Sequence, residues 1–159
     1  MIELTVKNTL SGGLTKYFKK VALNQASGAD MKAKTRMGLD AINFVVNGSS
    51  KESVVPPVLM GILRASGSVH VGSVFVGGNN LYPASGATPN KSHTDNPDTV
   101  TLGFNTSYAA KMHETDWMPG PVSRQSGDTG NKFLQKHLDA DKEVLVAVYA
   151  AVLKKETGA

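Results

Sequence analysis

The chain has 159 residues, of which 40% are hydrophobic and 19% charged, and this composition is typical of one globular domain. It contains no cysteine, which excludes disulfides, a thiol nucleophile and any cysteine-based metal site. The 17 lysine and arginine residues exceed the 13 acidic residues by four, an excess that permits an acidic partner without requiring nucleic acid. We therefore expect a single domain over residues 1–159.

The N-terminal third predicts a strand followed by helices. Apolar and polar residues alternate over Met1–Val6, as in a short half-buried strand, and residues 1–8 lack the apolar run of a signal peptide. Helical spacing then recurs at Leu14, Phe18, Val21 and Ala22, and again at Ala29, Ala33, Met37, Ala41 and Phe44. We expect Asp30 in the N-cap region of the second helix and Gly48 as its left-handed C-terminal cap.

The middle of the chain predicts strands separated by a long loop. Residues 66–77 alternate with β-branched side chains and predict one strand, and Val100, Leu102 and Phe104 predict a partner strand. Residues 79–98 hold several proline, asparagine and glycine residues and predict a long loop. No run approaches the roughly 18 consecutive apolar residues of a membrane span.

The C-terminal third predicts helices around a second long loop. Residues 107–114 predict a short helical piece, and residues 115–129 predict the loop. Phe133, Leu134 and Leu138 open a further helix, and Asp139 or Asp141 caps the last one, whose apolar face we expect at Val144, Leu145, Val148, Ala151 and Val152. The order of elements predicts an α+β fold with a small antiparallel sheet packed by N-terminal and C-terminal helices.

No enzyme motif is complete in this sequence. His113-Glu114 begins like a metalloprotease helix, but Trp117 stands where the second histidine is needed. A metal site assembled from His113, Glu114 and Asp116, with His93 and Asp95, remains an alternative. Ser66 lacks the nucleophile-elbow context, and residues 126–132 have the wrong spacing for a phosphate loop.

Basic residues concentrate near the N-terminus. Residues 1–48 hold seven lysine or arginine residues and three acidic ones, an excess that equals the net charge of the whole chain. Six of them are candidates for contact with DNA phosphates or an acidic partner: Lys16, Lys19, Lys20, Lys32, Lys34 and Arg36. The simpler interpretation, which we favour, is a solvated helix face.

Three short segments of the chain, taken in order, are similar to the sequence pattern of a known family. Residues 56–67 read PPVLMGILRASG, residues 100–114 read VTLGFNTSYAAKMHE, and residues 130–134 read GNKFL before an amphipathic helix. Together they resemble the tailed-phage minor capsid and tail-completion proteins of the head–tail neck. The pattern of that family is a proline followed by Gly-x-Leu-Arg-x-Ser, a strand ending in Tyr-Ala, a His-Glu pair, and Lys-Phe-Leu before the last helix. This chain departs from it at Leu59-Met60, where many relatives have Asp-Thr.

In this interpretation the matched residues determine the fold and do no chemistry: Gly61, Leu63, Arg64, Ser66, Tyr108, His113, Glu114, Phe133 and Leu134. We expect Gly61 to allow a tight turn and Arg64 to pair with a carboxylate or with backbone carbonyls. Tyr108 should pack the short helix on the sheet, while His113 and Glu114 form a local hydrogen bond.

The resemblance implies a non-enzymatic structural subunit of a phage virion, without a cofactor, made in the bacterial cytoplasm. Its expected partners are further copies in a ring, neighbouring portal, adaptor, neck or tail proteins, and DNA in the channel. Loops 79–98 and 115–129 are the expected contact surfaces. Two alternatives stay open: a small metal-dependent enzyme using His113, Glu114 and Asp116, and a basic DNA-binding accessory module.

Overall fold

The structure is a computed structural model that describes residues 2–6, 28–57, 61–78, 95–118, 120, 121, 123 and 129–158. Its elements are β1 (Ile2–Val6), α2 (Ala29–Asn47), α3 (Ile62–Ala65), β2 (Gly67–Val71), β3 (Val74–Gly78), β4 (Val100–Phe104), α4 (Ala109–Glu114), α6 (Phe133–Ala140) and α7 (Lys142–Thr157). The predicted helix around residues 14–22 and most of loop 79–98 lie outside the described residues, as do several residues of loop 115–129.

The strands form one antiparallel sheet in the order β1-β4-β2-β3. Leu102 at the centre of β4 pairs with Leu4 on one side and Val69 on the other. Every residue of β2 and β4 is buried, which fits their position between the two outer strands. The predicted α+β class is therefore confirmed, with strands at Ile2–Val6 and Val100–Phe104 as expected.

One strand prediction is wrong. Residues 66–77 do not form one strand but a hairpin, in which β2 and β3 are joined by Gly72 and Ser73. Gly72 has a φ of 56°, which glycine adopts without a steric penalty and which suits a two-residue hairpin turn. The alternating pattern runs on through both strands, so periodicity alone did not reveal the reversal of the chain.

Helix α2 lies directly on the sheet and approaches it closely at Gly38, which has no side chain. Ala41 is buried there, and a Cβ built on Gly38 would lie 2.5 Å from Val69 Cγ1. The helix ends as predicted at Gly48, whose φ is 82°. It begins differently, since Gly28 occupies the N-cap and Asp30 lies in the first turn.

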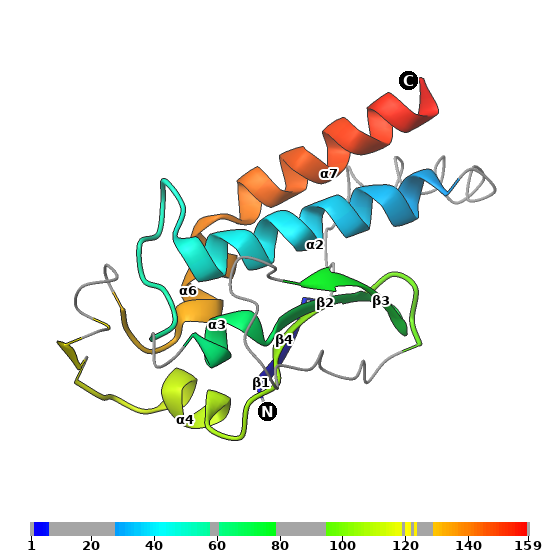
Figure 1. Cartoon of the computed structure of the whole chain (residues 1–159). Coiled ribbons are helices and arrows are strands. Elements are labelled where there is room, and N and C mark those ends of the chain that lie inside the picture. The colour runs from blue at the N-terminus through cyan, green and yellow to red at the C-terminus, as the bar shows by residue number, and fades with distance from the viewer. Residues whose placement is uncertain are drawn as a thin grey trace.

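The layers run from the sheet through α2 to α7, which lies antiparallel along the far side of α2 (Figure 1). Leu145 near the start of α7 joins the core of the sheet, and Tyr149 and Leu153 pack against Ala29 and Ala33 of α2. Of the face predicted for α7, Leu145 is buried. The valines are half-buried and Ala151 is exposed, so the buried side is rotated toward Tyr149 and Leu153.

Candidate functional site

The first motif segment builds a short helix at one end of the sheet. Gly61 has a φ of 72° and starts α3, as the expected tight turn requires. Leu63 is 1% exposed and belongs to the core. Ser66 Oγ donates a hydrogen bond to the Leu63 carbonyl at 2.8 Å and so closes the helix before β2 begins. The glycine and the serine thus set the two ends of α3.

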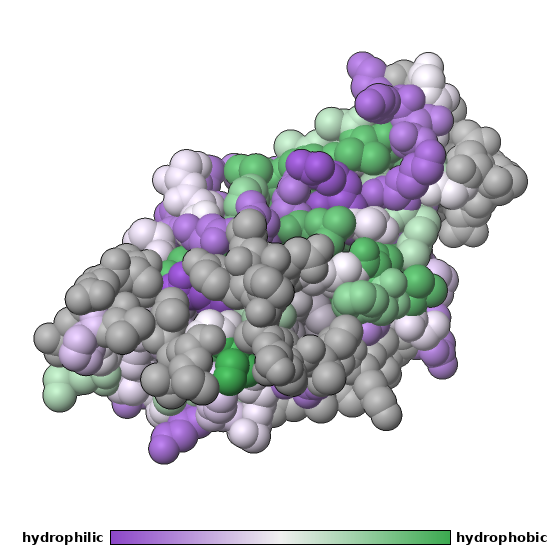
Figure 2. All heavy atoms as spheres, in the orientation of Figure 1, coloured by the Kyte–Doolittle hydropathy of each residue, from purple (hydrophilic) through white to green (hydrophobic). Residues whose placement is uncertain are grey.

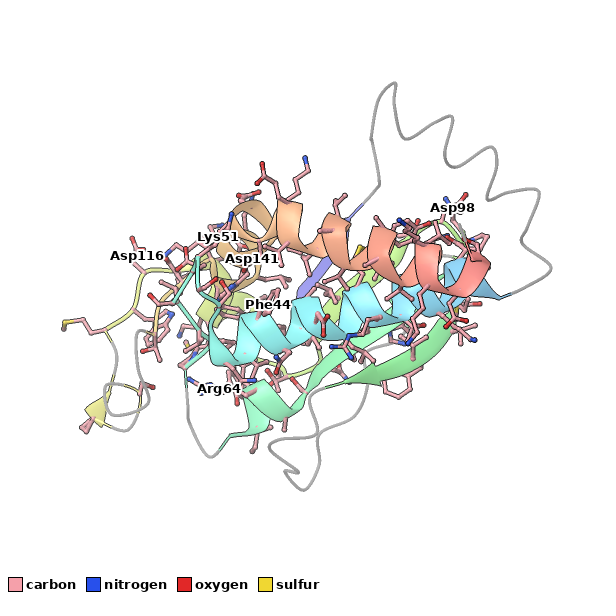
Figure 3. The ribbon with its side chains drawn as sticks, turned by 90° about the horizontal axis from the view of Figure 1, so that it is seen from above. Phe44, Lys51, Arg64, Asp98, Asp116 and Asp141 are labelled. Atoms are coloured by element: carbon pink, nitrogen blue, oxygen red, sulfur yellow. The ribbon has the colours of Figure 1, made fainter. Side chains whose placement is uncertain are left out.

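Arg64 is buried in this helix with 4% exposure, and Figure 3 shows it on α3 beside α2. Its Nε donates a hydrogen bond to the Pro56 carbonyl at 2.9 Å. A backbone carbonyl, one of the two kinds of partner expected for this guanidinium, is therefore among its partners. The bond ties the segment before α3 to the helix, which fixes the approach to β2.

The second and third motif segments meet in the core. Phe133 and Leu134 at the start of α6 are fully buried. The Phe133 ring lies edge-on to Phe104 of β4, with centroids 5.5 Å apart, and edge-on to His113 of α4 at 5.0 Å. Such aromatic pairs contribute beyond the area that they bury. These contacts hold the start of α6 in the core.

Tyr108 connects the second segment to the first. It immediately precedes α4, is half-buried, and is hydrogen-bonded to the backbone of Leu63. Burial raises the pKa of the Tyr108 phenol above its ordinary value of 10.0, and the hydrogen bond opposes that rise. Four residues of the three motif segments are therefore joined at this end of the sheet, and we call them the motif cluster: Leu63, Tyr108, His113 and Phe133.

His113 and Glu114 form the expected local hydrogen bond. His113 Nδ1 lies 2.6 Å from Glu114 Oε1, and the second carboxylate oxygen is paired with Lys132 Nζ. The bonds from Lys132 and His113 lower the pKa of the exposed Glu114 carboxyl below its ordinary value of 4.5. His113 is 3% exposed, so its ring is held in place by Phe133 and Glu114.

The described residues do not assemble the metal alternative. Asp116 Oδ1 accepts a hydrogen bond from Asn131 Nδ2 at 2.5 Å, and Figure 3 shows Asp116 at the left of the view, on the loop that follows α4. Within the described ranges, no three histidine, aspartate or glutamate side chains are placed to hold a metal ion. His93 lies outside these ranges.

The prediction that Lys34 belongs to an exposed basic contact surface is wrong, because this side chain is buried. It is 6% exposed, and its Nζ donates to Asp30 Oδ2, Asp98 Oδ1 and the Pro97 carbonyl at 2.5, 2.9 and 2.9 Å. Tyr149 Oη donates to the other oxygen of Asp30 at 2.7 Å. Lys34 therefore joins α2, α7 and the segment before β4, because a buried ammonium is stable only with such partners.

The other described basic candidates remain at the surface but are paired. Lys32 Nζ lies 2.5 Å from Glu156 on α7, and Arg36 Nε lies 3.0 Å from Asp40 one turn along α2. Their side chains are 61% and 64% exposed. Lys16, Lys19 and Lys20 lie outside the described residues. The part of the proposed surface that the structure describes is thus partly neutralised.

A buried polar network that the sequence analysis did not single out lies at the opposite end of α2. His137 is 1% exposed, with Nδ1 2.9 Å from Asp141 Oδ2 and Nε2 2.9 Å from the Val54 carbonyl. Ser49 Oγ donates to Asp141 Oδ1 at 2.7 Å. Figure 3 shows Asp141 at this end and Asp98 at the other. The four-residue spacing of His137 and Asp141 is the signal that could have revealed the pair.

Comparisons with known proteins add no assignment: no family model matches the chain, and neither does any curated protein or solved structure. Among the helices of the described residues, none is both long enough and apolar enough to cross a membrane.

Proposed function

We propose that the chain is a structural subunit of a tailed-phage virion, located at the head–tail neck or in a tail-completion ring. It acts by assembling with other proteins and not by catalysis. The class rests on the order and spacing of the three sequence motifs, each of which is weak alone, and the first segment departs from the neck-protein pattern at Leu59-Met60.

The observation that carries the proposal is the motif cluster itself. Tyr108 of the second segment is hydrogen-bonded to Leu63 of the first, and Phe133 of the third contacts His113 of the second. Contacts among the three segments are what a shared family pattern would require. The motif residues support the proposal because they hold the fold together, as the resemblance to the neck proteins implies.

The polar groups suggested for chemistry also have structural roles. His113 and Glu114 bond to each other, and Glu114 also pairs with Lys132. Asp116 holds Asn131. These contacts connect α4 to the start of α6, so their effect is to fix the cluster. This favours a role in assembly over the metal-dependent alternative.

Contacts with neighbouring subunits would come from the two long loops. Met118 in loop 115–129 is 87% exposed, which is high for a large apolar side chain. A ring uses heterologous interfaces, in which one surface of a subunit binds a different surface of the next. A protruding methionine suits such a contact because its flexible side chain adapts to irregular surfaces.

The test is co-expression with the portal, capsid and tail proteins of the same phage, followed by mass spectrometry and electron microscopy of purified particles. We expect the chain in the particles, as a ring at the neck. Met118→Glu should reduce incorporation, whereas Ser107→Glu, at another exposed position, should not. A protein that is absent from particles and forms no ring with these partners would overturn the proposal.

A further inference from the structure

Helix α7 is apolar around most of its circumference. From Val144 to Leu153 its sequence contains no charged residue, and its one polar side chain, Tyr149, is buried. A helix of this kind is normally packed on all sides. In the part of the chain that the structure describes, α7 packs against α2 and α6. Figure 2 shows apolar surface along α7, ending in hydrophilic surface at its C-terminal end.

The side of α7 that faces away from α2 is defined here as its outer face: Glu143, Val144, Ala147, Ala150, Ala151 and Lys154. All are exposed except Val144, which is half-buried. Glu143, Ala147, Ala150 and Lys154 recur at helical spacing and so follow one line along the helix. The outer face thus has a negative group in the first turn, an apolar centre, and a positive group in the last turn.

We propose that the outer face of α7 pairs with the same face of a second copy of this chain, with the two helices antiparallel about a two-fold axis. In that arrangement Glu143 of each copy lies beside Lys154 of the other, so the contact contains two opposite-charge pairs. A parallel arrangement would bring like charges together. The charge pattern is therefore complementary to itself, which favours a second copy over an unrelated partner.

The apolar centre suits the same arrangement. Two antiparallel helices bring Ala147 of one copy near Ala150 of the other, and alanines permit interaxial distances near the lower end of the usual 8–10 Å. Within one chain, Glu143 is 92% exposed and lies 4.0 Å from Lys51. Such a surface ion pair is weak and does not prevent Glu143 from turning to a new partner.

The contact should be reversible. Two helices of this length bury less than the roughly 1,200 Å² of a typical stable interface, so we expect a weak dimer that depends on concentration. The inference goes beyond the proposed function, because an isologous contact joins two subunits whether or not either belongs to a ring. Its failure would leave the neck assignment untouched.

The test is sedimentation velocity of the full chain over a wide range of concentrations. We expect a monomer–dimer equilibrium for the natural chain. Glu143→Lys and Lys154→Glu should each weaken the dimer roughly tenfold, because each substitution removes both pairs. The double variant, with the charges exchanged, should regain the affinity of the natural chain to within about threefold.

Two further variants separate the outer face from general effects of charge. Ala147→Glu puts a carboxylate at the centre of the contact and should abolish the dimer, whereas Gln135→Glu, at an exposed position of α6, should leave it unchanged. Circular dichroism should show that both variants are folded. A natural chain that stays monomeric at all concentrations, an undisturbed Ala147→Glu dimer, or a double variant that fails to recover would each overturn the inference.

Discussion

Replacing Phe133 by alanine tests whether the motif cluster holds this fold together. The side chain is fully buried where α6 begins, and its ring contacts Phe104 of β4 and His113 of α4 edge-on. Removal of the ring would leave a cavity between three elements that are distant in the sequence. We therefore expect a loss of stability and not a local effect on one helix.

The magnitude follows from this environment. A buried phenylalanine replaced by alanine costs about 3–5 kcal/mol, and the two ring contacts place Phe133 in the upper part of that range. In a chain of this length about 1 kcal/mol shifts the melting temperature by roughly 2–4 °C, so we expect a fall of roughly 10–15 °C. Phe133→Leu keeps much of the volume and should cost about 1–2 kcal/mol.

The assays are thermal denaturation and denaturation by guanidinium chloride, both followed by circular dichroism, with Phe75→Ala as the matched control. Phe75 lies on the outer strand β3, is 48% exposed, and its ring lies beside that of His70. Its removal should cost about 1 kcal/mol because half of the ring is already in water. If Phe133→Ala destabilised the protein no more than Phe75→Ala, the motif cluster would not be the centre of this core.

Three further predictions concern the backbone, a titration and a buried charge. Gly78→Ala should destabilise the protein by at least about 1–3 kcal/mol in the same assay, because the new Cβ would overlap a carbonyl oxygen of strand β2. NMR titration should find the Glu114 pKa below 4.5, and Lys132→Ala should raise it toward that value. Since this pKa is lowered by folding, the contribution of Glu114 to stability is present at neutral pH and is lost as the pH falls through the lowered pKa. Lys34→Ala should cost about 3–5 kcal/mol, because it leaves a nearly buried carboxylate without its ammonium partner, whereas Lys32→Ala should cost no more than about 1 kcal/mol. A Lys32 variant as unstable as the Lys34 variant would contradict this difference in burial.

Short-range sequence patterns were sufficient to predict most of the helices and strands. Alternation predicted the strands at Ile2–Val6 and Val100–Phe104, and helical spacing predicted α2, α6 and α7, because these periods reflect which side of an element is buried. The end of α2 at Gly48 could also be predicted from the local sequence, because a positive φ favours glycine. The same local logic failed at Gly72, where two strands with matching alternation look like one.

The roles of charged residues could not be predicted in this way. Lys34 and Lys32 lie two positions apart on α2 with the same side chain, yet one is buried among three oxygens and the other is exposed. The difference arises from the approach of Asp98 and Tyr149, which come from distant segments. The two lysines were predicted to belong to the same set of basic contact residues because a sequence shows the charge of a residue but not its burial.

What the sequence by itself determined is most of the elements and the α+β class, since the periodic patterns that predict them depend on neighbours within a few positions. Only the tertiary structure decided the hairpin at Gly72, the meeting of Phe133 with His113 and the burial of Lys34 and His137. These depend on contacts between segments that are far apart in the chain. Such contacts form only when the apolar faces of the helices and the sheet are buried together, and that is a property of the whole fold.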